Sequence, residues 1–160
     1  MAALIPNDLP AVNTDSTRQV QQAQLIRDQQ IVRELATRDR EVRAHEQAHA
    51  AAGGPHASHP HYQYTQGPNG VRYATAGHVN IDVSEVPGDP QATLAKMQTV
   101  VAAALAPAQP SPQDRAVAAK ASAAASKARS EIAQQDQEVQ NLAGRRELGS
   151  TSGSLLDVIV

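Results

Sequence analysis

The near absence of large apolar side chains is the feature that most constrains how this chain can fold. The 160 residues include no Phe, no Trp and three Tyr, so a core must be built from Ala, Val, Leu and Ile. Ala-rich helices pack closely but bury little apolar area each, and burial of apolar area is the main stabilising term. The composition therefore predicts an extended, mainly helical body of the size of one modest domain.

The charge balance and the lack of Cys exclude several classes of function. Without Cys there is no disulfide framework, no thiolate metal site and no cysteine nucleophile. Any metal must then be held by His, Asp or Glu. Fourteen basic and sixteen acidic side chains leave a formal charge of -2. Nucleic-acid binding usually requires a basic excess, so we expect no nucleic-acid partner.

The sequence shows neither a secretory signal at its start nor a segment that could span a membrane. Its start, MAALIPNDLPAV, lacks the basic segment and the long apolar run of a secretory signal. No window approaches the roughly 20 apolar residues of a membrane span. We therefore expect no membrane partner and, by default, a cytoplasmic location, although a non-classical export route leaves no such mark and stays open.

A long helix is predicted in the first third of the chain. The sequence from NTDSTRQV onward contains no Pro or Gly until Gly53, where Gly-Gly-Pro forms a strong stop. Ile31, Leu35 and Val42 recur at helical spacing. These signals predict one helix over about residues 16–52, with a break near Asp28 as an alternative.

A small antiparallel sheet is predicted next, in HYQYTQGPNGVRYATAGHVNIDVSEV. Pro68-Asn69-Gly70 has the chemistry of a hairpin turn between two short alternating runs. HVNIDV alternates again, with Val79, Ile81 and Val83 on one face. We therefore expect two or three strands.

Two Ala-rich helices are predicted after the sheet. Asp89 is a suitable N-cap and Pro90 a suitable first residue for the first of them. Ser111 and Pro112 begin the second, which ends at Gly144. Its apolar positions are mostly Ala, so pairing of such helices between chains is a possible route to a homo-oligomer.

The predicted fold is α+β and mainly helical. It comprises a long helix, a small antiparallel sheet and two Ala-rich helices. We expect a flexible arm over residues 1–13, a single domain over residues 14–145 and a C-terminal tail over residues 146–160. The apolar end of that tail, LLDVIV, could add a strand to the sheet or bind a partner.

The pentapeptide His45-Glu46-Gln47-Ala48-His49 lies in the last turns of the predicted long helix. Residues four apart lie on one helix face, so His45 and His49 can chelate one cation. Glu46 projects from the neighbouring face and can reach a water bound to that cation. This arrangement predicts a zinc site with a catalytic base. The alternative is a polar helix end with two solvated histidines, which the helix dipole also favours.

A catalytic zinc needs a third protein ligand and an open fourth position. His78, on the polar face of a predicted strand, is the first choice. His56 is the second. The run HEQAHAAAGGPH nearly reproduces the metzincin spacing but is one residue too long, which counts against this choice. Asp82 is the third, although it also suits a supporting role as hydrogen-bond acceptor for a ligand histidine. Tyr73 is a candidate to stabilise an oxyanion, with packing in the tyrosine-rich block as its more common role.

Three runs of the sequence resemble those of a known family. The runs RELATRDREVRAHEQAHAAAGG, YQYTQGPNGVRYATAGHVNIDVSEVPGDPQATLAKMQTVVAAALAP and PSPQDRAVAAKAS resemble the SprA-related family of bacterial metalloproteases over about residues 31–125. The resemblance implies a zincin-like catalytic domain with His45 and His49 as ligands and Glu46 as base. This chain has AGHV where the family has GGEV. If that Glu is the third ligand, His78 is a ligand-for-ligand exchange in a gluzincin-like site.

We therefore predict a small Zn²⁺-dependent metallopeptidase that acts on an extended peptide or protein substrate, with Glu46 and Tyr73 as catalytic residues. The zinc ligands predicted are His45, His49 and His78. A second hypothesis is a non-catalytic, metal-stabilised helical module that binds a partner. A third is a degenerate zincin that retains the fold but lacks a complete set of ligands.

Overall fold

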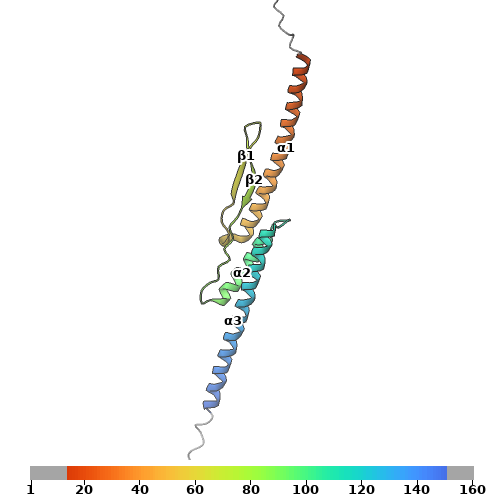
Figure 1. The fold of residues 1–160 in the computed structure, drawn as a ribbon. Helices are drawn as coiled ribbons and strands as arrows, with labels where there is room; N and C mark the ends of the chain where they lie inside the picture. Colours follow the sequence, from red (N-terminus) through yellow and green to blue (C-terminus); the bar gives the residue numbers. More distant parts are fainter. Residues whose placement is uncertain (1–13, 151–160) are drawn as a thin grey trace, which may run out of the picture. The chain divides into compact units, whose positions relative to one another are not determined.

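The computed structural model describes residues 14–150, and it is mainly helical with one small antiparallel sheet (Figure 1). The predicted fold class is thus confirmed. The elements follow the chain in this order: α1 (Thr14–Gly53), the short 3-10 helix η1 (Gly54–His56), β1 (His61–Gln66), β2 (Arg72–His78), α2 (Pro90–Ala104) and α3 (Pro112–Ser150).

The chain divides into two compact units. Of the described residues, the first unit holds 14–42 and 62–76, and the second holds 43–61 and 77–150. The predicted arm and the last ten residues of the predicted tail lie outside the described residues. The helix end predicted at Gly144 is wrong, because α3 continues to Ser150. Within the described part, no helix combines the length and the apolar character that a membrane crossing requires.

In the first unit, the predicted hairpin turn is confirmed. The Gly70 backbone N–H donates to the Gly67 carbonyl at 2.9 Å, and the Gly67 N–H donates to the Val71 carbonyl at 2.8 Å. Gly70 has φ +77°, a left-handed conformation that residues with a side chain rarely adopt. Asn69 adds a side-chain acceptor for the Val71 N–H at 3.2 Å. The turn therefore sets the pairing of β1 with β2.

Polar contacts tie the hairpin to α1 within this unit. The N–H of Ala74, a residue that is fully buried, donates to the Asp39 carboxylate at 2.7 Å. The Arg38 guanidinium donates to the Thr75 carbonyl at 3.2 Å. These bonds satisfy strand groups that would otherwise face α1 without a partner.

The third predicted strand does not form as a full strand. Residues 78–83 contribute one isolated antiparallel bridge, between Ile81 and Ala57. The flanking bonds run from the Ser58 N–H to the Asn80 carbonyl and from the Asp82 N–H to the His56 carbonyl, both 2.8 Å. The alternating pattern has a packing reason, because Ile81 and Val83 turn toward the apolar cluster of the second unit.

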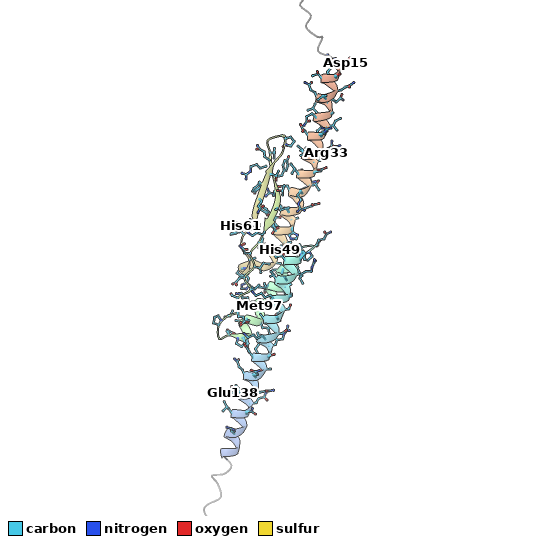
Figure 2. All side chains as sticks on the ribbon, viewed as in Figure 1. Asp15, Arg33, His49, His61, Met97 and Glu138 are labelled. Carbon is cyan, nitrogen blue, oxygen red and sulfur yellow. The ribbon has the colours of Figure 1, made fainter. Side chains whose placement is uncertain are left out.

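In the second unit, α2 and α3 run side by side (Figure 1). A thin core lies between them and includes Met97 (Figure 2). Its buried members are Met97 and Val100 from α2 and Ala121 and Ala125 from α3. Met97 and Val100 are the largest fully buried side chains of the described residues. The sequence expectation of an Ala-rich, thin core therefore holds in this unit.

Both helices of the core begin with a cap. Asp89 precedes α2, and its carboxylate accepts the Ala92 N–H at 2.8 Å, with Pro90 in the first helical position. That start was predicted correctly. At the start of α3, Ser111 and Asp114 exchange backbone-to-side-chain hydrogen bonds. This second cap brings a carboxylate to a fixed place at the helix start.

Candidate metal centre

The last turns of α1 bring His45 and His49 together, as the spacing predicted. Their Nε2 atoms lie 3.2 Å apart. The rings meet edge to face, with centroids 4.8 Å apart and an interplanar angle of 76°. Both histidines thus present the same ring nitrogen to one point in the second unit.

The third side chain at that point is Asp114, from the first turn of α3. Its Oδ2 lies 3.5 Å from the Nε2 of His45 and 3.4 Å from the Nε2 of His49. Within the described part of the chain, these three residues form the group that could hold a metal ion. Sequence reasoning missed Asp114.

A signal for Asp114 was present in the sequence. Ser111-Pro-Gln-Asp114 resembles the capping box that opens many helices. In the structure the Ser111 N–H donates to Asp114 Oδ2 at 2.6 Å, and the Asp114 N–H donates to Ser111 Oγ at 3.1 Å. The motif indicates that the carboxylate turns back over the helix start. It does not indicate that His45 and His49 lie there too.

The Asp114 carboxyl is held in its charged form. Burial works to raise its pKa, but the two Ser111 hydrogen bonds and the charges of His49 and His45 outweigh burial, so the pKa lies below its ordinary value. A carboxylate must be deprotonated to bind a metal. Asp114 therefore meets that condition at neutral pH.

The tautomer of His49 is set by a backbone carbonyl. Its Nδ1 lies 2.8 Å from the Ala103 carbonyl oxygen at the end of α2, and the ring is buried. A carbonyl can only accept, so Nδ1 carries a proton and Nε2 is the ring nitrogen that faces the cluster. Nε2 lies 3.4 Å from Asp114 Oδ2, a distance at which a cation or a proton between the two atoms would stabilise both. The hydrogen bond from Nδ1 to the Ala103 carbonyl is of the kind that metal-ligating histidines usually make.

The three separations fit a tetrahedral ion. Zinc bonds of about 2.0–2.1 Å place neighbouring ligand atoms about 3.3–3.4 Å apart in a tetrahedron. The distances here are 3.2, 3.4 and 3.5 Å. A single cation between the three atoms would therefore contact all of them at ordinary zinc–ligand distances.

Solvent reaches the cluster from one side. The His45 side chain is 29% exposed and that of Asp114 18% exposed, whereas that of His49 is 4% exposed. Glu46, the neighbour of His45 on α1, is buried at 5% exposure. An ion held by the three residues would thus keep a side open to water, which a catalytic site needs and a closed structural site lacks.

His78 lies elsewhere in the same unit. It is exposed, and its ring stacks on that of His61 with centroids 5.2 Å apart and an interplanar angle of 19°. It does not belong to the group formed by His45, His49 and Asp114. Its role as a zinc ligand stays a prediction.

The two reserve candidates for the third ligand have other contacts. The carboxylate of Asp82 accepts from the Lys96 ammonium at 2.7 Å, and this bond, with others from Ser84, holds the pKa of Asp82 well below its usual range. His56 lies in η1, where its carbonyl accepts the Asp82 N–H. Asp82 is therefore already paired with a cation from the protein itself.

Tyr73, the candidate oxyanion donor, lies in the first unit. Its hydroxyl accepts a hydrogen bond from the Asn69 side-chain amide at 2.9 Å, and the residue is half-buried. The contact places it at the hairpin turn. Its catalytic role stays a prediction.

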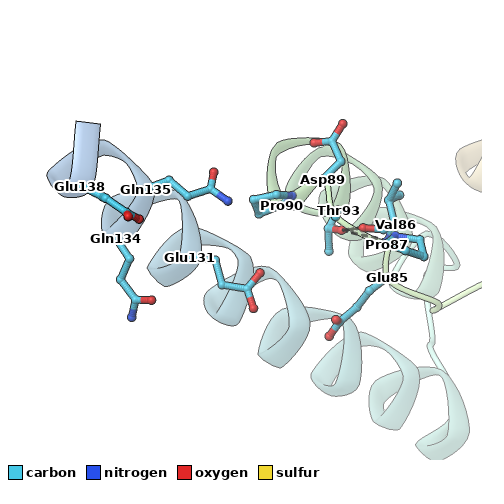
Figure 3. Close-up of a pocket in the computed structure, with 11 residues that line it drawn as sticks. Glu85, Val86, Pro87, Asp89, Pro90, Thr93, Glu131, Gln134, Gln135 and Glu138 are labelled. Carbon is cyan, nitrogen blue, oxygen red and sulfur yellow. Dashed lines mark hydrogen bonds between the residues drawn. The ribbon is translucent and has the colours of Figure 1, made fainter. Parts of the chain in front are cut away.

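A separate acidic groove lies between residues 85–90 and α3 (Figure 3). It encloses about 380 Å³ and is lined by Glu85, Asp89, Glu131 and Glu138 among others. Glu85 already accepts from the Lys127 ammonium at 2.8 Å. The groove contains no member of the histidine cluster.

The family of the chain follows from its sequence match. The model of the SprA-related family matches residues 11–148, so the chain belongs to the SprA-related family. That match includes α1 with its two histidines and the first turn of α3 with Asp114. Searches of curated proteins and of solved structures found no significant match.

Proposed function

We propose that this protein is a zinc-dependent metallopeptidase, with His45, His49 and Asp114 as metal ligands and Glu46 as general base. The observation that carries the proposal is the convergence of the three ligand atoms at tetrahedral separations, two of them from the helix that also bears Glu46. Asp114 takes the place that the sequence prediction gave to His78.

The donor set supports zinc among the common metals. Two imidazole nitrogens and one carboxylate oxygen suit Zn²⁺, whereas Ca²⁺ and Mg²⁺ prefer oxygen donors. Three protein ligands with a fourth position open to solvent are the arrangement of catalytic zinc sites. His45 lies on the exposed side of the cluster.

In the proposed reaction, zinc would activate water and the carbonyl, and side chains of the protein would transfer the proton. Zinc, when bound, lowers the pKa of a water to about 7 and polarises the carbonyl to be attacked. Glu46 would accept the proton of the attacking water and return it to the leaving amine. The Ala103 carbonyl holds His49 in the tautomer that leaves Nε2 to bind the metal. The substrate class proposed is a peptide or protein in extended form.

The first test compares the two candidates for the third ligand. Purified wild type, Asp114→Asn and His78→Ala would be dialysed against a weak chelator, and zinc would be measured per chain. We expect about one zinc in the wild type and in His78→Ala, and loss of zinc in Asp114→Asn. Retention in Asp114→Asn with loss in His78→Ala would overturn the assignment and restore His78.

The second test concerns catalysis. Glu46→Gln should keep the zinc and lose about 10²–10⁴-fold in peptide hydrolysis, because removal of a general base costs that much. A peptide library with mass-spectrometric detection would identify a substrate first. A zinc-loaded wild type that cleaves no peptide would contradict the proposal.

A structural zinc is the alternative, and one observation favours it. The core of the second unit is thin, with Met97 and Val100 as its largest fully buried side chains among the described residues. An ion would join the start of α3 to the last turns of α1 and so add stability that this core lacks. In that case Glu46→Gln would change neither zinc content nor any activity.

A further inference from the structure

The backbone of β2 comes very close to the side chain of Glu46. A Cβ added at Gly77 would lie 2.7 Å from Glu46 Cγ, and 3.1 Å from its Cδ and from its Oε1. Gly77 belongs to β2, and Glu46 is buried on α1. The two residues lie in the same unit of the chain.

Gly77 is not needed for its backbone conformation. The glycines with positive φ are Gly54, Gly70 and Gly88 among the described residues, so Gly77 has a conformation that alanine also adopts. What excludes a side chain at this position is space. A glycine inside a strand often marks such a close approach.

The contact restricts Glu46 at Cγ and not only at its carboxylate. Non-bonded carbon atoms rest about 3.5–4.0 Å apart, so a methyl group at Gly77 would displace Glu46 Cγ by about 1 Å. Cγ carries the carboxylate, and its displacement moves both oxygens. A free end of a flexible side chain could swing away, but a buried Glu46 has little room to do so.

We propose that Gly77 is a positioning residue, whose missing side chain lets the backbone of β2 pack against Glu46 and hold its carboxylate in one orientation. The inference rests on the proposed function for its catalytic consequence. The contact itself is independent of that function, and the experiment separates the two.

The catalytic test uses zinc-loaded Gly77→Ala. We expect kcat to fall about 100-fold, because a displacement of 1 Å of a catalytic group costs about that much. KM, zinc content and the visible spectrum of the Co²⁺-substituted protein should stay as in the wild type, because the three ligands are untouched. Gly144→Ala is the matched control, since a Cβ at Gly144 meets no atom within 4 Å.

The steric test needs no activity. Melting temperatures would be compared for wild type, Gly77→Ala, Glu46→Ala and the double variant. We expect Gly77→Ala to lower Tm by about 5 °C when Glu46 is present, through overpacking. In the Glu46→Ala background the same change should have little effect, because the atoms that the new methyl group meets are gone.

The outcomes distinguish the two proposals. Wild-type kcat in Gly77→Ala, or an equal loss of Tm in both backgrounds, would overturn the positioning role. Loss of zinc from Gly77→Ala would also overturn it, because the glycine would then support the ligands and not Glu46. A zinc-loaded wild type without activity would reject the proposed function alone, and the Tm cycle would still decide whether Gly77 holds Glu46.

Discussion

The two compact units of this chain are held by different kinds of contact. In the first unit, the backbone of β2 is tied to α1 through Asp39 and Arg38, and four large apolar side chains of α1 are exposed by 44–69% of their area. These four are Val20, Leu25, Ile26 and Ile31. In the first unit, hydrogen bonds thus join β2 to α1, while these apolar side chains of α1 stay exposed.

The second unit combines an apolar core with a polar cluster. Met97 and Val100 pack against alanines of α3. His49 is buried at 3% exposure and makes a hydrogen bond to the end of α2. The Asp114 carboxylate accepts a hydrogen bond from the Ser111 N–H. The candidate metal ligands thus lie on elements whose positions are set by packing.

The difference between the two units has a consequence for function. A metal site requires ligand atoms held to within a few tenths of an ångström, and rigid supporting elements provide that precision. The second unit offers such elements at the end of α1, the end of α2 and the start of α3. The described residues of the first unit offer no comparable group of His, Asp and Glu.

Metal removal should have the largest effect of the changes considered and should affect the two units differently. Zinc at about 1,000 times its Kd adds about 4 kcal/mol to the free energy of unfolding of the state that binds it. Chelation should remove that stabilisation. Hydrogen exchange should then accelerate around the start of α3 and leave the hairpin amides of residues 62–76 unchanged. Equal acceleration in both units would mean that the hairpin also depends on the metal.

The apolar core gives the next largest effect. Met97→Ala should lower the free energy of unfolding by about 3 kcal/mol, because it leaves a cavity at a fully buried position. Urea denaturation followed by circular dichroism would measure the change. Gln98→Ala, an exposed neighbour on α2, should change stability by no more than about 0.5 kcal/mol. Similar losses for both variants would contradict the assigned core.

The hydrogen bond from Ala74 to Asp39 tests the first unit. Asp39→Ala should cost about 2 kcal/mol, because it leaves a buried backbone N–H without this acceptor. Exchange of the Ala74 amide, followed by NMR, should accelerate with it. Asp39→Asn retains an oxygen acceptor and should lose less. Identical behaviour of the two variants would show that this bond does not hold β2.

The ion pair of Asp82 with Lys96 should give the smallest effect, since Asp82 is 56% exposed and solvent screens the pair. The bond from Lys96 lowers the pKa of Asp82 in the folded state. Its stabilisation is therefore present above the ordinary carboxyl pKa of about 4 and is lost as pH falls below it. Lys96→Met should raise the pKa of Asp82 toward its ordinary value in an NMR titration. An unchanged titration would exclude Lys96 as the cause.

Local patterns predicted much of the fold. The range of α1, predicted as residues 16–52, agrees closely with Thr14–Gly53, because Gly and Pro end the helix at a definite place. The hairpin turn at Pro68-Asn69-Gly70 and the start of α2 after Asp89 also followed from neighbouring residues. The third strand did not, because alternation indicates a buried face and not a pairing partner.

Local sequence accounts for two of the three residues in the candidate metal centre. His45 and His49 meet because residues four apart on a helix share a face, whatever packs around them. The capping pair of Ser111 and Asp114 is local in the same way, and so is the presence of Glu46 beside His45.

The third ligand and the close neighbour of Glu46 depend on how the elements pack together. Asp114 joins the histidines because α3 begins beside the last turns of α1, and Gly77 meets Glu46 because β2 passes over it. Both contacts join elements far apart in the sequence, so no local period or cap encodes them. They arise from packing, in which the position of each element depends on all the others.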